Sequence, residues 1–185
     1  RQVSDLLSAR FFRVYFSDDV IGLQVGGAVK NVLAIAAGLI DGLDLGDNCR
    51  AGVMSRGLVE MIRFGAAMGA KPQTLAGLSG LGDLILTATS STSRNYRFGK
   101  KIAHGQTLDQ AQKEEPHVIE GIKTARIISA LAASHGIDLG IINAVDGILH
   151  GDLPPERAIE YLLMRPRVDE FDSHLFDEKT YKNSA

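Results

Sequence analysis

A single lysine interrupts a long apolar run, and this run limits what the chain can fold into more than any other feature. Between Val20 and Ile40 the strongly polar side chains are Gln24, Lys30 and Asn31. An ammonium group in apolar surroundings is unfavourable unless a partner compensates its charge. On a helix, none of the side chains three or four positions from Lys30 would be a carboxylate. The sequence therefore predicts a helix whose lysine finds its partner elsewhere, with small residues leaving open space beside it.

The same run is long enough to raise the question of a membrane span. Gly22 and Gly26 have the spacing of a membrane-helix packing motif. However, a lysine at the centre of a span costs about 2.5–3.5 kcal/mol on insertion scales. Neither Trp nor Tyr occurs between Asp18 and Ser93, so an aromatic belt is also missing. We therefore expect a buried core helix and no stable membrane insertion.

Composition excludes several classes of protein. The 185 residues are 45% hydrophobic and 23% charged, which is typical of one globular domain with a real core. With a net charge of −2, the chain lacks the basic character expected of a nucleic-acid-binding domain. One cysteine, Cys49, cannot form an intramolecular disulfide and suits a reducing, cytoplasmic location. The five histidines lack ligand spacing, so we predict no metal site. Because the first residue is Arg1, we expect a fragment or a processed chain.

Strand patterns are nearly absent, and the chain reads as successive helices. The exception is residues 11–16, which are rich in aromatic and β-branched residues and predict one strand. A lone strand forms no sheet, so its partner must lie outside this chain or in another copy. We expect Asp18 or Ser17 to cap the long helix, and Thr107 with Gln110 to form a capping box. Helices are predicted at about 20–41, 47–69, 84–88, 93–105, 118–135, 138–149 and 155–164.

A run of hydroxyl residues leads into the helix that begins near Ser93. Its first turn holds Arg94 and Asn95. A helix N-terminus offers unpaired N–H groups and a partial positive charge, and arginine adds a planar fork. These residues suit a phosphate site. The same pattern has an alternative explanation without a ligand, in which Ser and Thr simply cap the helix and the basic residues face solvent.

Two carboxylates are also candidates for chemistry. Asp83 follows glycines that permit close backbone approach, and on a helix it would share one face with Thr87. Asp83 could merely cap the helix that follows, or it could supply the missing counter-charge for Lys30. Glu120 stands where a helix begins, and interaction with the helix dipole alone would explain it.

Five groups of residues follow one another in a recognisable order. They are Phe12-Arg-Val-Tyr15 with Asp19-Val-Ile-Gly22 and Gly26-Gly-Ala-Val-Lys30-Asn31; Arg50-Ala with Arg56-Gly-Leu-Val-Glu60; Leu78-Ser-Gly-Leu-Gly-Asp83-Leu; Ser93-Arg94-Asn95-Tyr-Arg97-Phe-Gly99; and Val118-Ile-Glu120-Gly121. Together they resemble the C-terminal domain of bacterial-type NAD(P)-dependent sn-glycerol-3-phosphate dehydrogenases. The resemblance runs from about Phe11 to about Met164, and several linked motifs make it specific.

The resemblance implies an all-α domain of the 6-phosphogluconate-dehydrogenase-like type, preceded by the last strand of a Rossmann domain. It implies that dihydroxyacetone phosphate and sn-glycerol 3-phosphate are interconverted with NAD or NADP, for glycerophospholipid synthesis. Lys30 would be the catalytic proton acceptor. By the same resemblance, the substrate-binding residues would be Lys30, Asp83, Thr87, Ser93, Arg94 and Asn95, and the cofactor-binding residues Arg94, Val118 and Glu120.

The chain departs from that family pattern in one respect, because it contains no G-x-G-x-x-G loop after a strand. We therefore expect the cofactor to be bound mainly by a missing nucleotide-binding domain, and the fragment alone to be inactive. The expected divisions are residues 1–17 as the end of that domain, 18–167 as the helical domain and 168–185 as a polar tail. Two alternatives stay open: a related hydroxy-acid or sugar-acid dehydrogenase, and a non-catalytic helical dimerisation module. A homodimer is compatible with each of these interpretations.

Overall fold

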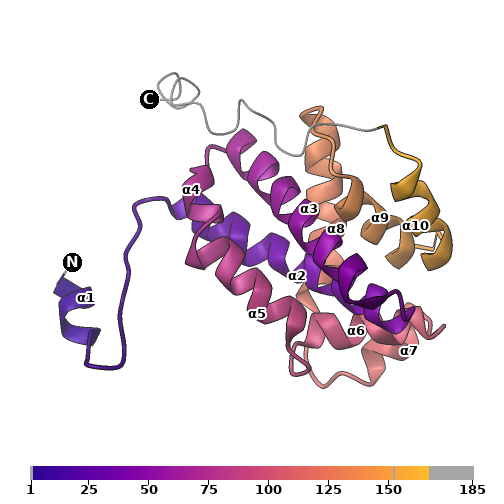
Figure 1. Cartoon of the computed structure of the whole chain (residues 1–185), viewed down its shortest axis with the longest axis horizontal. Coiled ribbons are helices and arrows are strands. Elements are labelled where there is room, and N and C mark those ends of the chain that lie inside the picture. Colours follow the sequence, from indigo (N-terminus) through magenta and orange to yellow (C-terminus); the bar gives the residue numbers. More distant parts are fainter. Residues whose placement is uncertain (1, 152, 167–185) are drawn as a thin grey trace.

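The computed structural model describes residues 2–151 and 153–166, and every regular element in these ranges is a helix (Figure 1). The prediction of an all-α domain is confirmed. In chain order the elements are α1 (Gln2–Leu7), α2 (Val20–Gly42), α3 (Gly46–Ala67), α4 (Pro72–Leu75), the π-helix η1 (Leu78–Gly82), α5 (Asp83–Thr89), α6 (Arg94–Ala103), α7 (Leu108–Lys113), α8 (Glu120–Ser134), α9 (Gly140–Leu149) and α10 (Pro155–Leu163).

The long apolar helix α2 is the centre of the fold. Helices α3, α5, α6 and α8 all pack against it, and every residue from Asn31 to Ile40 is buried. Among the described helices, α2 has the length and apolarity to cross a membrane. However, 61% of its most apolar 18-residue stretch is buried inside the fold. A helix that is apolar on all sides is expected where other helices cover all sides. The prediction of a core helix is therefore confirmed.

Two glycines allow α2 and α6 to approach unusually closely. A Cβ atom built on Gly38 would collide with the main-chain oxygen of Tyr96 and lie 2.9 Å from its carbonyl carbon. A Cβ atom on Gly99 would lie 3.0 Å from the main-chain nitrogen of Leu39. Because the obstructing atoms belong to the backbone, they cannot rotate away as a side chain could. The crossing thus fixes where the start of α6 lies relative to α2.

Most predicted helix ends agree with the structure to within two residues, and the capping box of Thr107 and Gln110 is confirmed. The predicted cap of α2 is wrong by one residue. Neither Ser17 nor Asp18 caps it; the cap is Asp19, whose Oδ1 accepts from the N–H of Gly22 at 2.8 Å. The reason is that Oδ2 of Asp19 also accepts from the N–H of Lys71 at 2.8 Å, a contact invisible in the local sequence.

The strand predicted at residues 11–16 does not form. Ala9 and Phe12 make an isolated antiparallel bridge, and no strand occurs in the described ranges. A ladder needs a second strand, and these residues have none beside them. Helix α1 and the segment after it lie apart from the helical bundle (Figure 1), and Phe11, Phe12 and Tyr15 are exposed. The predicted tail at residues 168–185 lies outside the described residues, and the domain divisions remain predictions.

Asp19 should contribute measurably to stability because it joins the start of α2 to the α3–α4 turn. Burial opposes its ionisation, but hydrogen bonds from Gly22, Thr74 and Lys71 outweigh it and lower the pKa of the carboxyl below its usual value. We expect Asp19→Ala to reduce the free energy of unfolding by about 2 kcal/mol at neutral pH in urea denaturation.

The pH dependence gives the control for this prediction. A lowered pKa in the folded state stabilises the fold above the unfolded-state pKa, and this stabilisation disappears as the pH falls through the folded-state value. The difference between Asp19→Ala and wild type should therefore shrink in acid, and Asp19→Asn should lose less than Asp19→Ala. A difference that does not change with pH would contradict a contribution from the ionised carboxylate.

Candidate active site

Lys30 on α2 forms an ion pair with Asp83, the first residue of α5. The lysine Nζ donates to Oδ2 of the aspartate. The lysine side chain is 21% exposed and the aspartate side chain 35%, so the pair is shielded but reachable from one side. Asp83 thus supplies the counter-charge that the apolar helix lacks.

The two glycines before Lys30 have different roles. A Cβ atom on Gly26 would lie 2.5 Å from the main-chain oxygen of Ser79, so only glycine lets the π-helix η1 pack directly on α2. Asp83 follows η1 and is thereby delivered to the lysine. In contrast, a Cβ atom on Gly27 would meet nothing within 4 Å. The expectation of open space is correct for Gly27 and wrong for Gly26, where the chain fills it.

Thr87 lies one helical turn after Asp83, as its spacing predicted. Its Oγ1 donates to the main-chain oxygen of Asp83 at 2.6 Å and lies 3.4 Å from Oδ1 of the same residue. The threonine hydroxyl is therefore placed beside the carboxylate. These contacts restrain the aspartate next to Lys30.

A second network begins at Asn31, beside the lysine. The Nδ2 of Asn31 donates to Oε2 of Glu120 at 3.0 Å and to the main-chain oxygen of Gly27 at 3.2 Å. Its Oδ1 accepts from Nδ2 of Asn95 at 3.0 Å, and Oδ1 of Asn95 accepts from the N–H of Gly121 at 3.0 Å. This chain of amides joins α2, α6 and α8. It therefore places the first turns of α6 and α8 beside Lys30.

The N-terminus of α6 combines a cap, an exposed guanidinium and a fixed loop. Ser93 caps the helix, with its Oγ accepting from the N–H of Tyr96 at 3.4 Å. Arg94 is exposed and has no hydrogen bond or ion pair with the described residues. The guanidinium of Arg97 donates to the main-chain oxygens of Ser91 and Thr92 and pairs with Glu115 at 2.8 Å. Arg97 thus holds the preceding loop, which leaves Arg94 available to a ligand.

Val118 and Glu120 lie at the start of α8. Val118 is 73% exposed, which is unusual for an aliphatic side chain without a covering element. Glu120 uses Oε2 to accept from Asn31, and no hydrogen bond to Oε1 occurs among the described residues. An acceptor oxygen and an apolar contact are therefore available where α8 meets α2.

The predicted site residues lie on α2 and at or near the starts of α5, α6 and α8, which all pack against α2. Hydrogen bonds join Lys30, Asp83 and Thr87 in one group, and Asn95 and Glu120 through Asn31 in another, whereas Ser93, Arg94 and Val118 make no hydrogen bond with either group among the described residues. Sequence reasoning missed Asn31, although a signal was present. Asn31 is the other polar side chain in the buried half of α2, and buried polar groups need hydrogen-bond partners. The arrangement places a proton-carrying lysine next to open space, and a free guanidinium at a helix N-terminus, which is suited to an anion.

Residues 19–160 match the family model described as the C-terminus of NAD-dependent glycerol-3-phosphate dehydrogenase. A protein of Xanthomonas euvesicatoria pv. vesicatoria, named glycerol-3-phosphate dehydrogenase (NAD(P)+), is 48% identical over 174 residues, covering 94% of this chain and 51% of its own length. A protein of the same name from Rhodospirillum rubrum is 54% identical over 160 residues, covering 86% of this chain and 46% of its own length. The chain thus spans about half the length of the curated relatives it matches.

Solved structures agree with the sequence relatives. The crystal structure of a glycerol-3-phosphate dehydrogenase from Coxiella burnetii superimposes with a TM-score of 0.84 at 45% identity, over 89% of this chain and 50% of that one. The glycerol-3-phosphate dehydrogenase of Saccharomyces cerevisiae gives a TM-score of 0.79 at 27% identity, over 86% of this chain and 47% of that one. The described helices are therefore shared with a known domain.

Proposed function

Because the chain belongs to the family of C-terminal domains of NAD-dependent glycerol-3-phosphate dehydrogenases, we propose that it is the substrate domain of an enzyme that interconverts dihydroxyacetone phosphate and sn-glycerol 3-phosphate. One observation carries the proposal. The ion-paired Lys30 faces a region where the amide network places the N-terminus of α6, with Arg94 unpaired among the described residues. A proton donor and a phosphate-binding group thus lie on neighbouring elements.

In the direction of reduction, Lys30 donates its proton to the oxygen that develops negative charge on C2. Before the transfer, the carboxylate of Asp83 pairs with the ammonium of Lys30 and holds it in place. After the transfer the product carries a hydroxyl and the lysine is neutral. In the direction of oxidation, the same lysine accepts the proton of that hydroxyl. General acid–base catalysis of this kind contributes typically about 10²–10⁴-fold.

Helix α6 would position the substrate. Arg94 binds the phosphate through its planar fork, and the unpaired N–H groups of the first turn add partial positive charge. The amides of Asn31 and Asn95 hold α6 against α2, so the distance from phosphate to lysine is set by rigid helices. Thr87 restrains Asp83 through its hydroxyl group. An unphosphorylated hydroxy acid would leave Arg94 unused, which disfavours that alternative.

The residues present fit a dinucleotide at the edge of this site. The free Oε1 of Glu120 and the exposed Val118 offer one acceptor and one apolar contact, and Arg94 lies nearby on α6. Bound NADH or NADPH would supply the hydride for C2. We propose that most of its binding surface belongs to the half of the relatives that this chain does not match. Glu120 and Val118 would then orient the end of the cofactor nearest Lys30.

Further proposals concern the setting of the enzyme. The product would serve as the backbone of glycerophospholipids, and the reaction would take place in the cytoplasm. The single thiol, Cys49, is compatible with that reducing compartment. We also propose that the enzyme has no stable membrane insertion, because the apolar helix α2 is used to build the core. A homodimer is compatible with this proposal.

The phosphate role of Arg94 can be tested in a full-length enzyme that contains this chain. We expect Arg94→Ala to raise the KM for dihydroxyacetone phosphate about 10–100-fold, because a charge-assisted bidentate contact is lost. The measurement is initial-rate kinetics of NADH or NADPH oxidation with dihydroxyacetone phosphate. Since the guanidinium has no partner among the described residues, the melting temperature should not change.

A matched control removes an arginine elsewhere. Arg157 on α10 is exposed and pairs with Glu160 at 3.4 Å, so Arg157→Ala removes one surface charge away from the site. It should leave the KM unchanged. If wild type reduces unphosphorylated hydroxyketones as well as dihydroxyacetone phosphate, or if Arg94→Ala has a normal KM, the proposed substrate class is wrong.

A further inference from the structure

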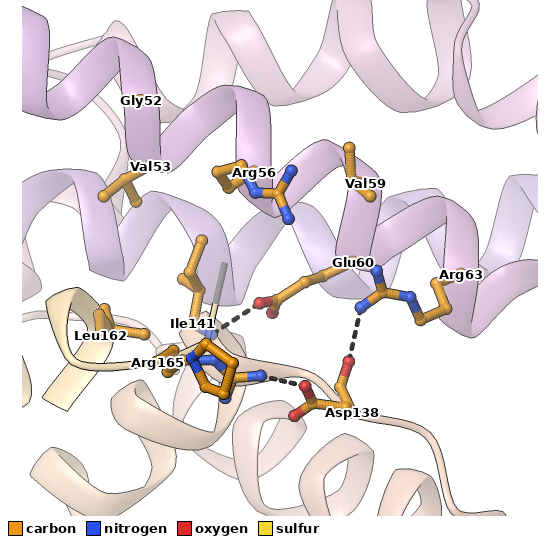
Figure 2. Close-up of a pocket in the computed structure, with 12 residues that line it drawn as sticks. Gly52, Val53, Arg56, Val59, Glu60, Arg63, Asp138, Ile141, Leu162 and Arg165 are labelled. Carbon is orange, nitrogen blue, oxygen red and sulfur yellow. Dashed lines mark hydrogen bonds and ion pairs between the residues drawn. The ribbon is translucent and has the colours of Figure 1, made fainter. Parts of the chain in front are cut away.

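A cavity separate from the Lys30 site lies between α3, the start of α9 and the end of α10 (Figure 2). Its volume is about 520 Å³, within the range of small-molecule sites. None of its lining residues belongs to the site described above. The cavity is therefore not explained by the proposed dehydrogenase chemistry.

Three guanidinium groups converge on this cavity, from Arg56, Arg63 and Arg165 (Figure 2). Among the lining residues that the structure describes, the carboxylates are those of Glu60 and Asp138, and the three arginines outnumber them. Arg63 donates to the main-chain oxygen of Asp138 at 2.8 Å, and Arg165 pairs with the carboxylate of Asp138. These contacts fix Arg63 and Arg165 against the segment that leads into α9.

The carboxylate of Glu60 is committed to a structural task. It is 8% exposed, and its two oxygens accept from the N–H groups of Ile141 at 2.8 Å and Ile142 at 3.1 Å. Burial raises the pKa of Glu60 above its usual value, and the two hydrogen bonds together with the charges of Arg165 and Arg63 only partly oppose this. The residue therefore caps α9, and both of its oxygens are already engaged by that helix.

Apolar side chains complete the wall. Val53 and Val59 come from α3, Ile141 from α9 and Leu162 from α10. Arginine forks bind phosphate or carboxylate groups in a bidentate manner, and an apolar wall binds an organic body. We propose that this cavity is a second binding site, which takes a small organic anion with a phosphate or carboxylate head and an apolar body.

The proposal can be tested on the isotope-labelled chain by amide NMR with phenyl phosphate, benzoate and the neutral analogue benzyl alcohol. We expect saturable shifts at Gly140, Ile141 and Ile142 with at least one anion and none with benzyl alcohol. The two anions distinguish a phosphate head from a carboxylate head. Shifts near Arg94 report the other site separately, so failure here and failure of the proposed function can be told apart.

Three variants make the test specific. Arg56→Gln should weaken binding at α9 about tenfold or more, because a charge-assisted contact is lost. Gly52→Leu should also block it, since a Cβ atom on Gly52 meets nothing within 4 Å and the added side chain would enter the cavity without altering its charges. Arg157→Gln, outside the cavity on α10, should bind normally.

The second of these variants keeps the test decisive if Arg56→Gln fails to fold. Absence of saturable shifts at α9 with both anions would overturn the proposal. So would equal binding of benzyl alcohol, or wild-type affinity in both Arg56→Gln and Gly52→Leu.

Discussion

Replacement of Lys30 by methionine should lower kcat of a full-length enzyme containing this chain by at least about 100-fold. Methionine keeps the length and the apolar stem of the side chain but cannot carry a proton. The loss should fall mainly on kcat, since Arg94 and the N-terminus of α6 would still bind the phosphate. The measurement is steady-state kinetics in both directions, with dihydroxyacetone phosphate and with sn-glycerol 3-phosphate.

The fold should survive this change, because the Lys30 side chain is only partly enclosed and its partner Asp83 keeps access to solvent. Lys71→Met is a matched control, since Lys71 also pairs with an aspartate, Asp18, at 2.7 Å, but on the exposed surface. It should retain wild-type kcat. Near-normal turnover of Lys30→Met would exclude the lysine as the proton donor, whatever the substrate proves to be.

Asp83 distinguishes a charge effect from a positioning effect. Asp83→Asn keeps the shape of the side chain but removes the negative charge that stabilises the ammonium. The kcat for reduction should then fall about tenfold, because the proton donor loses its charged partner. If Asp83 only positions the lysine, Asp83→Asn should keep near-wild-type kcat, because its amide oxygen can still accept the hydrogen bond.

Much of the fold was predictable from the sequence because its signals are local. The apolar run of α2, the capping box at Thr107 and the glycine after α8 each act over a few residues. Helix boundaries follow from such signals with small errors. The strand at residues 11–16 failed for the opposite reason, since a strand depends on a partner that local pattern cannot supply.

The candidate site also has a part that was predictable from the sequence and a part that was not. Lys30 stood out because a charge in an apolar helix has a known cost, and Asp83, after its run of glycines, was already a candidate for the counter-charge. The contacts between Asn31 and Asn95, or between Glu60 and Ile141, join residues 64 and 81 positions apart. No periodicity encodes such pairs. The π-helix η1, which aims Asp83 at the lysine, was visible in the sequence only as glycines that permit close backbone approach.

The close crossing of α2 and α6 leads to the second large prediction. In an ordinary helix interior, replacing glycine by alanine stabilises by about 1 kcal/mol. Gly38→Ala should do the opposite and lower the free energy of unfolding by about 3 kcal/mol, or prevent folding, because the new methyl group meets the backbone of Tyr96. The sign of the change therefore separates packing from helix propensity.

Gly52→Ala provides the matched control, because Gly52 also lies inside a helix and a Cβ atom there meets nothing within 4 Å. Urea denaturation followed by circular dichroism should show Gly52→Ala as stable as wild type or more so, and Gly38→Ala as much less stable. Equal stability of the two variants would mean that α2 and α6 can separate at little cost. The amide link from Asn31 to Asn95 would then not be held by rigid packing, and Arg94 could not keep a fixed distance from Lys30. The stability of Gly38→Ala thus tests the rigidity on which the proposed positioning of the phosphate depends.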